Sequence, residues 1–162
     1  MSYRLQAPAA IAISALLGAC QSTTAPAIQS ASTELRSAPT SAILAGQGLH
    51  VDATIWRDFM PSSPPDGKPL IVIARIQADN GATVSGAVTA DSLWVLLDGQ
   101  AWAARAVEEQ ARAAIDTGFE VVARNGPKWG PGIPVDVVVR LRDGSGSVAY
   151  VRAINQLIRR TD

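Results

Sequence analysis

The chain has 162 residues, of which 48% are hydrophobic, 17% charged and 5% aromatic, and its 14 basic residues balance its 14 acidic ones. This length allows one domain with short appendages, and the zero net charge gives no positive field that would draw the chain to nucleic acid. A single cysteine and a single histidine leave no pair for an internal disulfide or a zinc site, so we predict no metal and no other cofactor.

The first twenty residues have the pattern of an export signal. One cation, Arg4, precedes an apolar run over residues 7–19, which is shorter than the about 20 residues that a membrane-spanning helix needs. The run ends in Leu17-Gly18-Ala19-Cys20, with small residues directly before the only cysteine. This ending resembles the lipobox of bacterial lipoproteins. The resemblance implies that residues 1–19 are a signal peptide and that Cys20 becomes the acylated first residue of the mature chain.

The same resemblance implies a location in the cell envelope. Gln21, rather than an aspartate, follows the cysteine, and the sorting rule of that family then implies release to the outer membrane, facing the periplasm or the cell surface. Acyl chains hold a protein at a membrane because each buried methylene contributes roughly 0.8 kcal/mol. The membrane is therefore the first expected partner. The alternative is an ordinary secretory signal cut after Ala19, which would leave a free thiol.

Residues 20–47 are predicted to form a lipidated N-terminus and a disordered tether. Serine, threonine, alanine and proline dominate this segment, and no apolar period is sustained in it, so it lacks the apolar surface that would order it. A flexible chain of this length reaches roughly 25 to 30 Å. Two roles stay open, since the tether would lift a domain off the membrane or only pass the anchor to its transporter.

Residues 48–162 are punctuated by turn signals at short intervals, which predicts a mainly β fold. We expect an immunoglobulin-like antiparallel β-sandwich of about seven strands. The Asp98-Gly99 pair is a strong hairpin signal, but the alanine-rich segment after it favours a helix, so one short helix near 108–114 is left open. The expected strands are residues 49–59, 70–78, 83–88, 93–107 with a turn at 98–99, 119–124, 135–141 and 148–158.

Two further patterns support the sandwich. The turn Trp129-Gly130-Pro131-Gly132 before a valine-rich strand resembles the corner before the penultimate strand of immunoglobulin-like domains in bacterial exported proteins. Four tryptophans, at positions 56, 94, 102 and 129, fall on strands or strand entries and are expected to close the core. The alternation over residues 135–141 predicts a half-buried strand, paired with the final strand next to it. Its inward face carries Val135, Val137, Val139 and Leu141, and its solvent face carries Asp136, Val138, Arg140 and Arg142.

One group of basic residues is a candidate binding site. Arg140 and Arg142 share a face of their strand, and Arg152 on the hairpin partner is expected beside them. Such an arginine stripe can bind carboxylates, phosphates or an acidic partner surface. The alternative is the ordinary wet face of an antiparallel sheet. The loops at residues 60–68 and 125–132 are the other candidate surfaces.

The sequence predicts no catalytic residues, and we expect the protein not to be an enzyme. No G-x-S-x-G motif occurs, and the one candidate base, His50, starts the first strand. Asp52, Asp58 and Asp66 suggest an alternative, a loop-carboxylate module that binds a metal or hydrolyses a substrate. A passive structural lipoprotein is a third hypothesis. The favoured interpretation is a lipid-anchored envelope protein whose β-sandwich binds another envelope protein or a polysaccharide.

Overall fold

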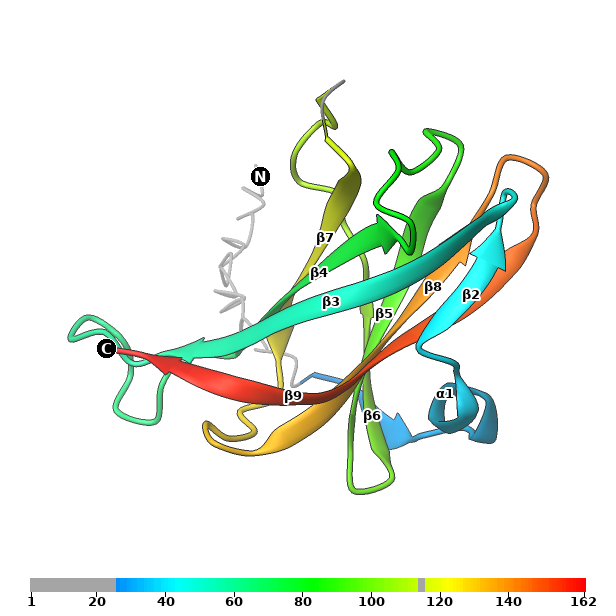
Figure 1. Ribbon diagram of the computed structural model, residues 1–162. Helices are drawn as coiled ribbons and strands as arrows, with labels where there is room; N and C mark the ends of the chain where they lie inside the picture. Colours follow the sequence, from blue (N-terminus) through cyan, green and yellow to red (C-terminus); the bar gives the residue numbers. More distant parts are fainter. Residues whose placement is uncertain (1–25, 114–115) are drawn as a thin grey trace, which may run out of the picture.

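The computed structural model of the chain describes residues 26–113 and 116–162. Cys20 and the predicted signal peptide lie outside the described residues. The described chain contains nine strands and one short helix (Figure 1), so the prediction of a mainly β fold is confirmed. The elements are β1 (Ile28–Ser30), α1 (Thr33–Ser37), β2 (Ser41–Leu44), β3 (Gln47–Asp58), β4 (Leu70–Ala78), β5 (Thr89–Leu97), β6 (Gln100–Arg105), β7 (Gly118–Gly126), β8 (Pro134–Arg142) and β9 (Val148–Thr161).

The strands form one curled sheet in the order β1-β6-β5-β8-β9-β3-β4-β7, with β2 attached to β3. The sheet has two halves, one made of β1, β6, β5 and β8 and the other of β2, β3, β4 and β7, and the long strand β9 belongs to both (Figure 1). Its first part pairs antiparallel with β8, and its last residues pair in parallel with β3. A register shift in the β8 pairing and a positive φ of 56° at Asn155 mark an irregularity of the kind that bends a strand, which lets β9 pass from one half to the other.

The two ends of the sheet meet on the opposite side. Val107, which follows β6, exchanges two backbone hydrogen bonds with Val122 of β7, at 3.1 and 2.8 Å. The sheet therefore encloses its main core almost completely. Every second residue of β4 points inward, and Leu70, Val72, Ala74 and Ile76 have no exposed surface, as expected for a strand at the centre of a sheet half.

A second, smaller apolar cluster lies outside the curled sheet, under α1. Leu35 of α1 is 5% exposed and packs in a cluster with Val138 of β8, which is completely buried. The helix begins where the backbone N–H of Leu35 donates to the Ser32 hydroxyl at 3.3 Å, an N-cap of the usual kind. The prediction of a disordered tether is therefore wrong for residues 28–44, because strands far along the chain supply the apolar surface that orders them.

Several strand predictions are confirmed. The Asp98-Gly99 hairpin joins β5 to β6, and both turn residues have positive φ, 48° and 80°. Strand β4 has the predicted bounds, and β8 pairs with β9. The inward set of β8 is also as predicted, because Val135, Val137, Val139 and Leu141 are all buried.

One local prediction is wrong. Residues 83–88 form a loop rather than a strand, held by a hydrogen bond of 2.9 Å from the Ser85 N–H to the Gln47 side chain. The short helix that was left open near 108–114 does not form over residues 108–113, where Glu109 and Arg112 bind β7 instead; residue 114 lies outside the described residues. The expectation for the tryptophans holds only in part. Trp102 is 3% exposed in the main core, where Gly126 leaves room for its ring, whereas Trp94 packs on the outer cluster.

Candidate functional site

The structure places the predicted arginine stripe on one outer face, with its charges already paired. Arg140 donates to both oxygens of Asp91, at 2.6 and 3.0 Å, and to the Ser92 hydroxyl at 2.9 Å. Arg142 donates to the same carboxylate at 2.6 Å. These hydrogen bonds, that from Arg140 first, lower the pKa of Asp91 to about 2. One carboxylate on β5 thus binds two arginines of β8.

Arg152 lies on the same outer face and fastens α1. It is the register partner of Val138, two positions along β9 from Tyr150, which faces Arg140. Its Nη1 atom donates to the carbonyl of Arg36 and lies 3.7 Å from Asp136 Oδ2. All three arginines therefore contact groups of the protein itself, which favours the structural interpretation of the stripe over an anion site.

The two end loops that the sequence suggested as surfaces are joined through Arg57, which sequence reasoning missed. Its side chain is 3% exposed, and its guanidinium donates to the carbonyls of Lys68 at 3.0 Å, Lys128 at 3.0 Å and Gly130 at 2.8 Å, and to that of Asp66. Burial lowers its pKa from the ordinary arginine value. The local sequence Trp56-Arg57-Asp58 does not indicate a buried cation. The one signal is the alternation of β3, which places Arg57 on the same side as the inward residues of that strand.

The loop aspartates proposed for the alternative module bind lysines. Asp58 accepts from Lys68 at 2.7 Å, and Asp66 accepts from Lys128 at 2.6 Å. Asp52 is exposed on β3. Over residues 26–113 and 116–162, no three His, Cys, Asp or Glu side chains form a group that could hold a metal ion. The structure thus does not bring these three aspartates together.

His50 belongs to a small cluster at the other end of the sheet. Its Nδ1 atom lies 2.8 Å from Asp79 Oδ1, and the Ser41 hydroxyl donates to Asp79 Oδ2 at 2.5 Å. A Ser-His-Asp triad needs the serine bonded to the histidine, whereas here both groups bind the aspartate. The cluster ties β2 and β3 to the turn after β4.

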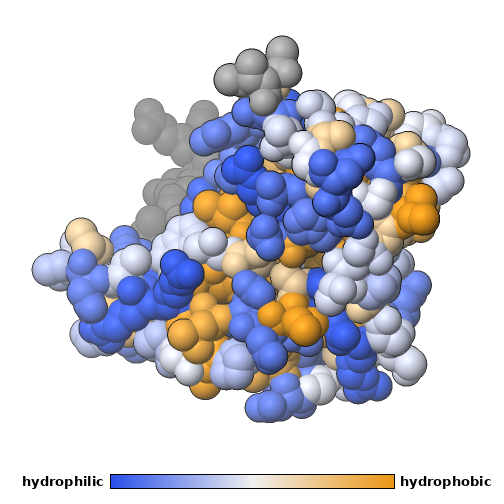
Figure 2. All heavy atoms as spheres, viewed as in Figure 1, coloured by the Kyte–Doolittle hydropathy of each residue, from blue (hydrophilic) through white to orange (hydrophobic). Residues whose placement is uncertain are grey.

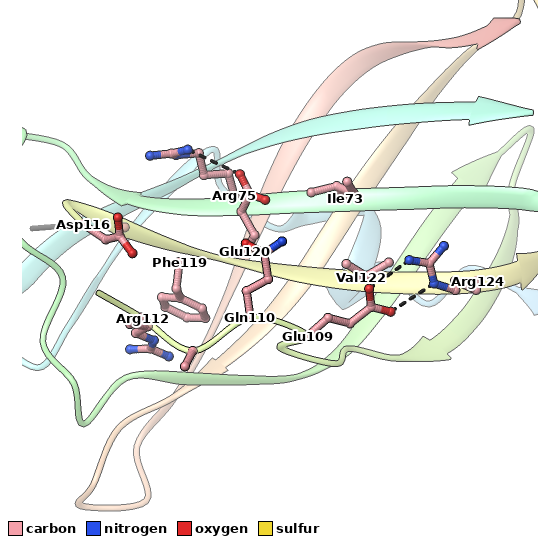
Figure 3. Close-up of a pocket in the computed structure, with 12 residues that line it drawn as sticks. Ile73, Arg75, Glu109, Gln110, Arg112, Asp116, Phe119, Glu120, Val122 and Arg124 are labelled. Atoms are coloured by element: carbon pink, nitrogen blue, oxygen red, sulfur yellow. Dashed lines mark hydrogen bonds and ion pairs between the residues drawn. The ribbon is translucent and has the colours of Figure 1, made fainter. Parts of the chain in front are cut away.

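A pocket of about 310 Å³ lies on the outer face of β4 and β7, under the loop at residues 109–112 (Figure 3). Its apolar part is formed by Ile73 and Val122 on the outer face, by Ala111 of the loop and by Phe119, which is the register partner of the inward Ile76 and belongs to the main core. Polar and charged side chains surround this apolar surface, and Figure 3 shows that they extend from both strands and from the loop. They are Arg75, Glu109, Gln110, Arg112, Asp116, Glu120 and Arg124.

One ion pair and one cation–π contact hold the loop over the pocket. Glu109 accepts from Arg124 of β7 at 3.0 and 2.8 Å, a two-pronged geometry that lowers the pKa of Glu109 and raises that of Arg124. Arg112 binds Glu108 at 2.8 Å and stacks on the Phe119 ring at 3.6 Å from its centroid. The loop is thus fastened at both sides of Gln110.

Arg112 also donates to the carbonyl of Val88 at 2.8 Å, so it connects the loop with the entry of β5 as well as with β7. Sequence reasoning missed the pocket because its members come from three separate segments. One signal was present, namely Arg75, a charged residue within the otherwise apolar first part of β4. Such a residue indicates an outward position on the strand, but it does not indicate which residues of other segments will lie beside it.

The face that carries β3 and β9 shows apolar residues in small separate groups between polar ones (Figure 2). Ile43 of β2 is 81% exposed, and Ile154 and Leu157 of β9 are about half exposed. Scattered apolar residues of this kind are common on protein surfaces.

No protein-family model, no curated protein and no solved structure matches the chain. In the part of the chain that the structure describes, no helix is long and apolar enough to cross a membrane.

Proposed function

We propose that the chain is a lipid-anchored protein of the bacterial envelope whose immunoglobulin-like β domain binds another envelope component without catalysis. The lipobox at residues 17–20 supports the anchor, with Cys20 as the acylated residue and Gln21 favouring the outer membrane. The partner is another envelope protein or a polysaccharide. The membrane contact is made by the acyl chains.

The strand order supports the immunoglobulin-like assignment. In such domains, strands A, B and E form one sheet, and strands C, F and G form the other with C′ beside C. Lettering the strands from β3 in chain order, with strand D of the A-B-E-D sheet left out, gives A-B-E for β3-β4-β7 and C′-C-F-G for β6-β5-β8-β9, which is the observed order of neighbours. The parallel contact of β3 with β9 joins the first and last of these strands.

The pocket of Figure 3 is the observation that carries the binding role. A concave site with an apolar floor and several convergent polar groups is the usual form of a ligand site. Here Glu109 and Arg112 fix the loop that covers the floor, so the site is formed before a ligand arrives. Preformed sites bind more tightly because less ordering is needed on binding.

Mass spectrometry of the N-terminal peptide tests the anchor. We expect wild-type protein from membranes to begin at Cys20 and to carry a diacylglycerol and an added acyl chain, and the Cys20→Ser protein to carry neither. A wild-type chain that begins at Met1, or whose Cys20 is a free thiol, would contradict the proposal.

Co-sedimentation tests the binding role. The full chain with Cys20→Ser, which has no lipid, is mixed with envelopes isolated from the host cells and centrifuged. We expect it to sediment with them, and Glu120→Lys to reduce the bound fraction about tenfold because a second cation then lies beside Arg75, its register partner on β4. Glu34→Lys on α1 makes the same charge change outside the pocket and should sediment normally. Equal sedimentation of the two variants would contradict the role of the pocket.

A further inference from the structure

The pocket of Figure 3 offers hydrogen-bond donors and acceptors in nearly equal measure. Arg75 and Glu120 meet in a single contact of 3.3 Å, and their side chains are 46% and 44% exposed. Most of the N–H groups of Arg75 and one oxygen of Glu120 therefore stay open to a ligand. Gln110 projects from the loop towards β7 (Figure 3), and its amide can donate and accept.

The charges of the pocket cancel. Three arginines, at positions 75, 112 and 124, stand against the carboxylates of Glu109, Asp116 and Glu120. Arg124 and Arg112 are already engaged by glutamates in two-pronged pairs. A ligand with a net charge would gain little from such a site, since each favourable contact would be offset by a repulsive one nearby.

The floor gives a ligand a small apolar surface to cover. Ile73 is half-buried and supplies most of this surface, with Val122, which is 7% exposed, beside it, whereas the Phe119 ring is covered by Arg112. The volume of about 310 Å³ is at the lower end of the range for small-molecule sites, roughly 300 to 1,000 Å³. The ligand is therefore compact, uncharged, rich in groups that both donate and accept, and apolar on one side.

A neutral sugar ring has this combination of properties. Its neighbouring hydroxyls match the paired oxygens of a carboxylate and the paired N–H groups of a guanidinium or an amide, and its C–H face covers apolar side chains. An extended peptide is recognised mainly through the backbone of a sheet edge. Strand β7 is the last strand of the sheet, but Val107 already pairs with its Val122, and the pocket beside it is lined by side chains of β4, β7 and the loop at residues 109–112.

Building on the proposed function, we propose that the envelope component is a polysaccharide and that the pocket binds an uncharged sugar unit of it. Glu120 and Arg75 bind hydroxyls from the strand side, and Gln110 binds them from the loop. Ile73 and Val122 contact the C–H face of the ring. Glu109 and Arg112 are positioning residues, because they hold the loop that carries Gln110.

Saturation-transfer NMR and calorimetry on the full chain with Cys20→Ser test this proposal with four probes. Two are neutral, maltotriose and the disaccharide of N-acetylglucosamine; one is anionic, a hyaluronan tetrasaccharide; and one is a peptide, tetra-alanine. We expect a neutral saccharide to bind in the millimolar range or tighter. Gln110→Ala and Glu120→Ala should each weaken that binding about tenfold, since each removes hydrogen bonds to the ligand. Gln100→Ala, an exposed glutamine at the start of β6, is the matched control.

Three results would overturn the proposal: no binding of either neutral saccharide, equal binding by the pocket variants, or binding of tetra-alanine or the anionic tetrasaccharide alone. Its failure is distinguishable from failure of the proposed function. If the sugars fail while sedimentation with envelopes still depends on Glu120, the pocket binds a different envelope component. If that sedimentation also fails, the binding role itself is wrong.

Discussion

Arg57 shows how one buried charge can organise two loops. A guanidinium is tolerated in a protein interior only when its N–H groups find acceptors, and here the acceptors are carbonyls from residues 66–68 and 128–130. Phe59 packs beside it, with the guanidinium 5.0 Å from the ring centroid, and Arg160 stacks on the same ring at 4.1 Å. The loops at this end are thereby held as one surface.

We expect Arg57→Met to lower the free energy of unfolding by about 3 kcal/mol, because methionine fills the space but leaves buried carbonyls without a donor. Urea denaturation followed by tryptophan fluorescence measures the loss, and limited proteolysis should show faster cleavage within residues 60–68. Arg159→Met removes an exposed cation nearby on β9 and should stay within about 0.5 kcal/mol of wild type. A stable Arg57→Met protein with unchanged proteolysis would show that the loops hold without this cation.

Asp91 makes part of the stability depend on pH. Its pKa is near 2 in the fold and 3.8 in the unfolded reference, so the carboxylate form is favoured by folding. The contribution is complete above about pH 5 and is lost as the pH falls towards 2. Because the side chain is 35% exposed, we expect about 1 kcal/mol after allowing for solvent screening.

Urea denaturation at pH 7 and at pH 2.5 checks the Asp91 contribution. Asp91→Asn should be less stable than wild type at pH 7 by about that amount, and the gap should narrow at pH 2.5. Asp52→Asn removes an exposed aspartate of β3 and should give the same small difference at both pH values. A gap for Asp91→Asn that stays constant with pH would mean that the arginine pairs contribute nothing.

At the scale of elements, α1 converts an outer sheet face into a second core. Leu35 and its neighbours cover Val138, which the alternation over residues 135–141 had placed on the wet face. Leu35→Ala should cost about 2 to 3 kcal/mol, since it empties a buried site. Ile43→Ala, at 81% exposure, is the control and should be nearly neutral. Thermal denaturation measures both, and equal melting temperatures would show that α1 adds no stability.

The same elements show what sequence patterns can predict. Strands with a strict alternation, such as β8, and hairpins with an Asp-Gly turn were predicted because their signals are local. The ordered structure of residues 28–44 was not predicted, since their few apolar side chains are buried only by packing against strands that lie far along the chain. The segment at 108–113 was ambiguous for the same reason, because its ion pair with Arg124 and its stacking on Phe119 override local propensity.

For the molecule as a whole, function was less predictable than fold. The arginine stripe was placed correctly on one face, but only the structure shows Asp91 and Asp136 beside its cations. The pocket brings together residues 73–75, 109–112 and 116–124, and no spacing rule links such segments. A site built from outward residues of neighbouring strands can be predicted only when the strand order is known. Here that order includes the parallel pair of β3 and β9, which cannot be predicted by joining consecutive strands into hairpins.

That parallel pair predicts how the molecule unfolds. Strand β9 belongs to both halves of the sheet. Its residue Ile158, which is 1% exposed, begins the pairing of β9 with β3 and packs against Gly130. We expect Ile158→Ala to cost about 3 kcal/mol and to lower protection of β4 and β5 amides equally, because the halves share one strand and one core. Leu157→Ala, its neighbour at 54% exposure, should change neither. Native-state hydrogen exchange measures both halves at once, and loss of protection in β4 alone would show that they unfold separately.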